Sequence, residues 1–132
     1  MPNELTEQQL SEFKKSLETS ISQLKQEISE ELLASDNEGY IELAGQVHDR
    51  EEESVADLLV DVNLAVIDNH IRALENTEAA LARLNRGSYG SCLDCGDAIP
   101  VERLRAYPVA ERCRICQTRY EQTHRGSERH TL

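Results

Sequence analysis

Four cysteines are the residues of this sequence whose type and spacing point most directly to chemistry. They form two C-x-x-C pairs with 17 residues between the pairs: Cys92, Cys95, Cys113 and Cys116. Each pair can present two sulfur atoms to one ion, and Zn²⁺ prefers four ligands in a tetrahedron, for which thiolates serve well. This spacing lies within the range that is typical of zinc sites. The sequence therefore predicts one Zn²⁺ bound by all four cysteine thiolates.

The predicted zinc site is structural. Four thiolates fill the coordination sphere of the ion and leave no position for a catalytic water. The segment around the cysteines has few apolar residues, so it needs the stability that metal binding supplies, about 10 kcal/mol in small zinc modules. Gly96 directly follows Cys95 and suits the left-handed backbone of a metal-binding turn. Four arginines could offset the negative charge of the site: Arg103, Arg105, Arg112 and Arg114.

A thiol redox switch is the alternative use of the cysteines. Thioredoxin-type chemistry normally uses one C-x-x-C within a βαβ pattern, and this sequence shows no such pattern. It also lacks a nucleotide-binding glycine loop, a nucleophile paired with a base and an open metal position. We therefore expect no enzyme activity, and we keep zinc release on oxidation, as in a thiol-based stress sensor, as the alternative hypothesis.

The first expected element is a helix from Thr6 to Leu33. Thr6 and Gln9 form a capping-box pattern at its start. Apolar residues then recur in steps of three and four, which is the period of one helix face. Gly and Asn residues weaken the helical pattern after this helix, so residues 34–49 are expected as a turn region with at most a short helical piece.

A second long helix is expected from Asp49 to Arg86, a span of 38 residues or about 57 Å. Asp49 and Glu52 resemble a second capping box, and Gly87 supplies a left-handed cap at the end. The apolar face of this helix is broad, and neither long helix can bury its face alone. The two helices are therefore predicted to pair as an antiparallel coiled coil.

The predicted fold class is mainly α, a long antiparallel helical hairpin followed by a small C4 zinc finger with a short C-terminal helix. The hairpin takes residues 1–86, with its tip at about 34–49. The zinc finger takes residues 87–123, and residues 124–132 are expected to be a flexible tail.

The charge of the chain is unevenly distributed. Residues 1–100 carry 7 basic and 21 acidic side chains, a net charge of −14, whereas residues 101–132 carry a net charge of +3. A strongly acidic body disfavours DNA binding, which needs clustered cations, and suits docking on a basic protein surface. No apolar run is long enough to span a membrane, so we expect a cytoplasmic protein with reduced thiols.

The zinc-finger segment resembles the DksA/TraR family of C4 zinc-finger proteins. The resemblance rests on Gly87-Ser-Tyr-Gly-Ser-Cys92 and on Arg103-Leu-Arg-Ala-Tyr-Pro108, together with the two cysteine pairs. It implies direct binding to bacterial RNA polymerase, with the coiled coil in the secondary channel and the zinc finger bracing its base. It also implies regulation of transcription, in the archetype together with guanosine tetraphosphate, without sequence-specific DNA binding.

The tip of the hairpin departs from the family pattern. The archetype carries Asp-x-x-Asp-x-Ala at its tip, and the nearest stretch here is Gln46-Val-His48-Asp49-Arg-Glu51. Only Asp49 matches directly, so the expected partner-binding residues are Asp49, Glu51 and His48. Because the tip is altered, a zinc-stabilised helical adaptor for another protein partner is the alternative function.

Overall fold

The computed structural model describes residues 5–50, 54–62 and 64–130, with side chains described as far as His124. The described chain is mainly helical, which confirms the predicted fold class. It contains no strand, and a single isolated antiparallel bridge joins Ser91 to Ala98. The helices are α1 (Glu7–Leu33), α2 (Glu38–Asp49), the 3₁₀ turn η1 (Ala56–Leu59), α3 (Ala65–Arg86), α4 (Val101–Ala106) and α5 (Arg114–His130).

The first helix begins and ends where the sequence predicts. The Thr6 hydroxyl accepts a hydrogen bond from the backbone N–H of Gln9 at 3.1 Å, and the Gln9 side chain accepts one from the N–H of Thr6 at 2.9 Å. This reciprocal capping box pairs two N–H groups that the first helical turn leaves without partners.

The predicted second helix is wrong in its N-terminal half. Asp49 is the last residue of α2 rather than the cap of a new helix, and α3 begins only at Ala65. Glu52, the expected partner of Asp49 in the cap, lies outside the described residues. Between the two helices the chain turns inward and buries Val55 and Leu59 almost completely. A single straight helix would present an apolar face too broad for one partner helix to cover. Because the chain is broken into separate elements, the apolar residues on both edges of that face are buried.

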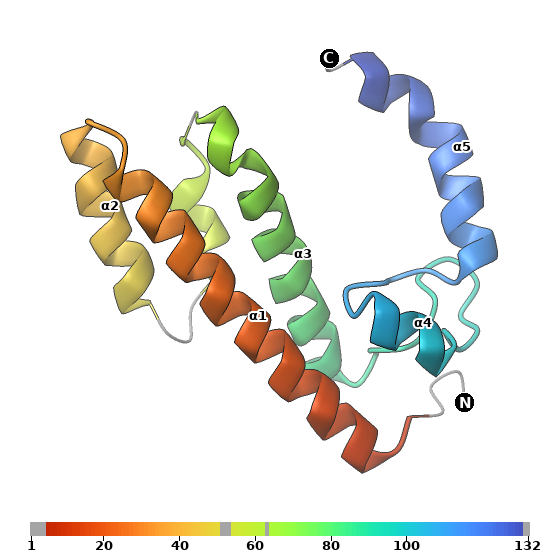
Figure 1. Cartoon of the computed structure of the whole chain (residues 1–132). Helices are drawn as coiled ribbons and strands as arrows, with labels where there is room; N and C mark the ends of the chain where they lie inside the picture. Colours follow the sequence, from red (N-terminus) through yellow and green to blue (C-terminus); the bar gives the residue numbers. More distant parts are fainter. Residues whose placement is uncertain (1–4, 51–53, 63, 131–132) are drawn as a thin grey trace.

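The region expected as a turn is instead a helix of 12 residues. Asn37 caps α2, because its side-chain oxygen accepts a hydrogen bond from the N–H of Tyr40 at 3.2 Å. Both α2 and α3 run antiparallel to α1, so the expected pair of helices becomes a three-helix arrangement (Figure 1). The buried Ser29 hydroxyl donates to the carbonyl of Ala44 at 3.2 Å and links α1 to α2.

The core is divided between the two ends of α1. One cluster lies far from the zinc-finger segment and joins α1, α2, η1 and α3: Ile28, Leu32, Ala44, Val47, Val55, Leu59, Ile67 and Leu74. The other cluster joins the start of α1 to the end of α3 and to the zinc-finger segment: Phe13, Leu17, Ala80, Tyr89, Cys92, Ile99, Leu104, Ala110 and Cys116. We call them the distal core and the finger core.

Within the part of the chain that is described, no helix is both long enough and apolar enough to cross a bilayer. The expected flexible tail, residues 124–132, continues α5 as far as His130 and so is not a separate segment up to that point. Its mobility stays a prediction.

His70 links α3 to α1 through two carboxylates. Its Nε2 lies 3.0 Å from Glu27 and its Nδ1 lies 2.6 Å from Glu31. We expect His70→Ala to lower the free energy of unfolding by about 1 kcal/mol, because a partly buried polar contact between the two helices is lost. Urea denaturation followed by circular dichroism measures the change. His48→Ala, at an exposed helical position, is the matched control and should leave the midpoint unchanged; equal effects of the two changes would contradict the assigned link.

Candidate metal centre

The structure brings the four cysteines together. Their Sγ atoms all lie within 4.8 Å of one another, and the Sγ atoms of Cys95 and Cys113 are 3.9 Å apart. A tetrahedron with Zn–S bonds of about 2.3 Å requires sulfur atoms about 3.8 Å apart. The spacing and the all-sulfur donor set therefore fit one structural Zn²⁺, as the sequence predicts.

The first cysteine pair lies in a tight turn after α3. The N–H of Cys92 donates to the carbonyl of Asp97 at 2.8 Å, and the N–H of Gly96 donates back to the carbonyl of Cys92 at 3.0 Å. Gly96 has a φ of 79° and Gly90 a φ of 87°, a region that disfavours side chains. The left-handed conformation expected at Gly96 is confirmed.

The second pair stands at the start of α5. Cys113 precedes the helix, and its carbonyl accepts the first helical hydrogen bond from the N–H of Gln117 at 2.8 Å. Cys116 lies in the first turn of α5. The N–H of Leu93 donates to the carbonyl of Glu111 at 2.7 Å and fixes the two halves of the site to each other.

In the metal-free chain the cluster cannot easily hold four negative charges. Burial acts to raise the pKa of the Cys92 thiol, but hydrogen bonds from the backbone at Cys95, Cys113 and Asp94 outweigh it and lower this pKa to about 6. The hydrogen bond with the Cys113 thiol, followed by burial, raises the pKa of Cys116 to about 12. The Cys92 thiol is thus readily ionised, whereas the Cys116 thiol is not. A bound divalent cation would stabilise the thiolate form of all four cysteines.

Residues 87–122 match the family model of the prokaryotic dksA/traR C4-type zinc finger. This segment of the chain is therefore a zinc finger of the dksA/traR C4 type. The chain is 27% identical over 114 residues to the RNA polymerase-binding transcription factor DksA of Salmonella typhimurium, covering 86% of this chain and 72% of that protein. It is also 39% identical over 56 residues to General stress protein 16O of Bacillus subtilis, covering 42% of this chain and 33% of that protein.

A solved structure shares the fold of this chain. Transcription factor DksA2 from Pseudomonas aeruginosa superposes with a TM-score of 0.61 at 23% sequence identity, covering 92% of this chain and 90% of the other. The similarity therefore includes the helical body as well as the zinc finger.

The zinc finger is fixed to the base of the helical body. Tyr89 is fully buried; its ring centroid lies 5.5 Å from that of Phe13 on α1, and its hydroxyl donates to the carbonyl of Pro108 at 2.8 Å. Burial raises the pKa of Tyr89 to about 12. Gly87, with a φ of 84°, ends α3 as expected and turns the chain into the finger.

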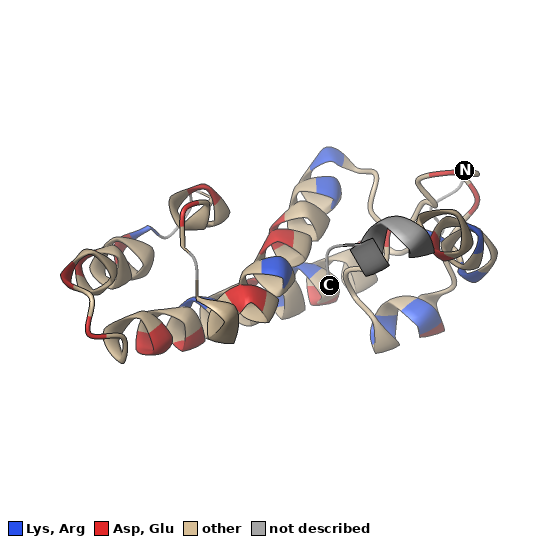
Figure 2. Ribbon diagram, turned by 90° about the horizontal axis from the view of Figure 1, so that it is seen from above, with Lys and Arg blue, Asp and Glu red and all other residues tan. Residues whose placement is uncertain are grey.

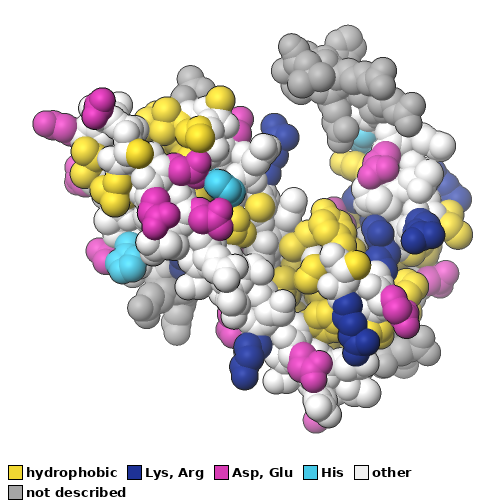
Figure 3. Space-filling model, in the orientation of Figure 1, with side chains coloured by type: hydrophobic (Ala, Val, Ile, Leu, Met, Phe, Trp, Pro, Cys, Tyr) yellow, Lys and Arg dark blue, Asp and Glu magenta, His cyan; other side chains and the backbone are white. Residues whose placement is uncertain are grey.

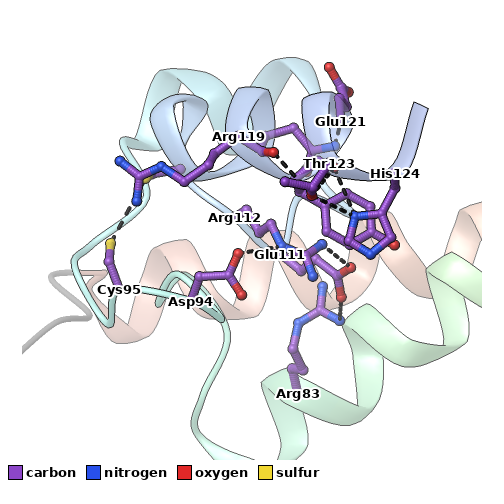
Figure 4. A network of polar contacts seen from close by, with 12 residues as sticks. Arg83, Asp94, Cys95, Glu111, Arg112, Arg119, Glu121, Thr123 and His124 are labelled. Carbon is purple, nitrogen blue, oxygen red and sulfur yellow. Dashed lines mark hydrogen bonds and ion pairs between the residues drawn. The ribbon is translucent and has the colours of Figure 1, made fainter. Parts of the chain in front are cut away.

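A polar network joins the finger to α3 and α5 (Figure 4). The Arg112 guanidinium donates to Asp94 at 2.8 Å and to Glu111 at 3.0 Å, and it lies 3.9 Å above the ring of Tyr120. Arg83 of α3 lies 3.7 Å from the other oxygen of Glu111. Arg112 was expected to offset the charge of the metal site, but its recorded partners are carboxylates and an aromatic ring.

Sequence reasoning missed Arg119 as a neighbour of the metal site. Its side chain points toward Cys95 (Figure 4). The available signal was its spacing, because Arg119 lies three residues after Cys116 and therefore on the same side of α5.

Two of the expected tip residues, His48 and Asp49, do not lie at the far end of the helical body. His48 and Asp49 are exposed at the end of α2, beside the middle of α1, where the Lys25 ammonium donates to the carbonyl of Arg50. The far end is formed by the turn between α1 and α2 and by the start of α3 (Figure 1). Glu51 lies outside the described residues. The partner-binding role of the three residues stays a prediction.

Proposed function

We propose that this protein is a bacterial transcription regulator that binds RNA polymerase directly, with the helical body in the secondary channel and the zinc finger bracing its base. The observation that carries the proposal is the 114-residue similarity to DksA, a protein named for binding RNA polymerase. The finger core supports the bracing role, because residues of α1, α3 and the finger share one buried cluster.

The charge distribution supports a protein partner rather than DNA. Acidic side chains predominate on the helical body, whereas arginines gather on the finger (Figures 2 and 3). The acidic body would repel DNA phosphates and suits a basic protein surface. Sequence-specific DNA binding is not part of the proposal, nor is enzyme activity, since four thiolates fill the zinc site. A cytoplasmic location accompanies a polymerase partner.

Competition on RNA polymerase tests the proposal. The zinc-loaded protein is titrated into bacterial core enzyme in the presence of a known secondary-channel factor, with and without guanosine tetraphosphate. We expect micromolar or tighter binding that the factor competes away. Binding without competition would mean that the protein binds elsewhere on the polymerase. Absence of binding would contradict the proposal and favour the alternative adaptor function.

The adaptor function has one structural observation in its favour. The break between α2 and α3 places Asp49 beside α1, so a carboxylate matching the family tip does not reach the far end of the body. A retained fold with a changed partner would account for this displacement. Affinity purification from lysate without polymerase subunits would favour it.

Asp49→Asn separates a regulatory role of Asp49 from a folding role. Asp49 ends α2, where a negative charge opposes the helix dipole, so the change should leave stability the same or raise it by about 0.5 kcal/mol. We expect transcription in vitro to change more than polymerase affinity does. Asp36→Asn, at an exposed position in the far-end turn, is the matched comparison; if it alters transcription and Asp49→Asn does not, the far end is the active part and Asp49 is not.

A further inference from the structure

A groove of about 580 Å³ lies where the end of α2 meets α1 and α3. Its lining includes Lys14 and Lys25 from α1, His48 from α2 and Arg50 directly after α2. These four residues define what we call the cationic groove. Lys14 and Lys25 are distant in the sequence from His48 and Arg50, so no basic run predicts the groove. Only the return of α2 along α1 brings the two pairs together.

The charge of this groove contrasts with the rest of the helical body. Residues 1–100 carry 7 Lys and Arg side chains among 21 Asp and Glu, and three of those seven line the groove. Glu18 is the carboxylate among the lining residues. With His48 neutral, the described lining residues therefore carry a net charge of +2, within residues 1–100 of net charge −14.

Within the described part of the chain, the two lysines of the groove form no ion pair with a carboxylate. Lys25 uses one N–H on the carbonyl of Arg50, which holds its ammonium at the groove and leaves two further donors. Cations in a strongly acidic protein ordinarily pair with its own carboxylates, so two lysines facing a shared hollow indicate a site for an external anion.

The remaining lining fits a small ligand. Ser22, Gln26 and Asn85 add hydrogen-bonding groups, whereas Ile21 and Leu81 are partly buried apolar side chains. A volume of about 580 Å³ is within the usual range for small-molecule sites. We propose that the cationic groove binds a small polyanion that carries phosphate or paired carboxylate groups. This site is separate from the zinc centre and does not depend on polymerase binding.

Isothermal titration of the full, zinc-loaded chain tests the site with two probes. Pyrophosphate represents the phosphate source and citrate the carboxylate source, at low ionic strength because salt screens such contacts. Binding of either probe supports the site, and the stronger one identifies the source. Absence of heat for both probes at millimolar concentrations would overturn the proposal.

Neighbouring lysines provide the matched variants. Lys14→Gln removes a charge from the cationic groove, and Lys15→Gln removes the same charge from the next exposed position, which lines a separate hollow with Glu12 and Thr19. We expect Lys14→Gln to weaken binding about tenfold, as for loss of one charged hydrogen bond, and Lys15→Gln by less than about twofold. Equal effects would mean unspecific attraction and would overturn the site.

The three glutamates that follow Arg50 in the sequence define a further control. A variant with Glu51, Glu52 and Glu53 changed to Gln should bind pyrophosphate or citrate with an affinity within about threefold of the wild type. We expect this small difference because the variant loses three negative charges that repel the anion from a distance. Binding that appears only in this variant would mean that carboxylates of the chain itself compete for the groove, and it would overturn the proposal of a site open to external ligands.

Discussion

Cys95→Ser is expected to remove the zinc and unfold the finger while the distal part of the helical body stays folded. One hydroxyl in place of a thiolate weakens the tetrahedral site, and metal binding contributes about 10 kcal/mol to modules of this size. The distal core contains no cysteine and joins α1, α2, η1 and α3, so most helical content should remain.

Metal analysis after dialysis against a mild chelator measures this effect, together with circular dichroism. We expect about one zinc per wild-type chain and far less in the variant. Leu93→Ser is the matched control, because it introduces the same residue into the same loop at a side chain that is 60% exposed. Full zinc occupancy in Cys95→Ser would show that the four-thiolate site is wrongly assigned.

Tyr89→Ala should produce the largest loss of stability among single changes outside the metal site. Tyr89 has no exposed surface, contacts Phe13 and donates to the carbonyl of Pro108. Removal of a buried aromatic side chain costs about 3–5 kcal/mol, and the Pro108 carbonyl also loses its partner. Because Tyr89 connects the finger to α1, its loss should also separate the unfolding of the two parts.

Thermal and urea unfolding, followed at the helices and at the zinc site, measure this change. Tyr107→Ala removes the same side chain from a position in the finger that is 50% exposed, and it should change the free energy of unfolding by less than about 1 kcal/mol. Tyr89→Phe should cost an intermediate amount, about 1 kcal/mol, for the hydrogen bond alone. A Tyr89→Ala protein as stable as Tyr107→Ala would contradict the finger core as the connection between finger and body.

The second helix shows where sequence reasoning failed. Its apolar residues continue in helical steps through Val55, Leu59 and Val62, and each residue by itself tolerates a helix. Apolar periodicity predicts which residues are buried, but it does not predict how many other elements pack against them. In the structure α2 and α3 both pack against α1 and η1 packs against α3, so α2 and α3 are separate helices, and Val55 and Leu59, which lie between them in the sequence, are buried.

The tip shows a related failure. Asp49 and Glu52 have the residue types of a capping box, but the same pattern occurs by chance where acidic residues are frequent, and Asp49 proved to end a helix instead of beginning one. Gly39 and Gly45 lowered the expectation of a helix before it. Their cost of about 1 kcal/mol each is offset by the burial of Ala44 and Val47 in the distal core.

The sequence by itself determined the metal centre, the start of α1 and the end of α3. Each of these depends on residues a few positions apart, because a C-x-x-C turn, a capping box and a glycine cap are local geometries. The tertiary structure alone decided the return of α2 along α1, the orientation of Arg119 toward Cys95 and the convergence of Lys14, Lys25 and Arg50. These features arise because several apolar faces pack against one helix. Their packing brings together residues whose spacing in the sequence does not predict that they are neighbours.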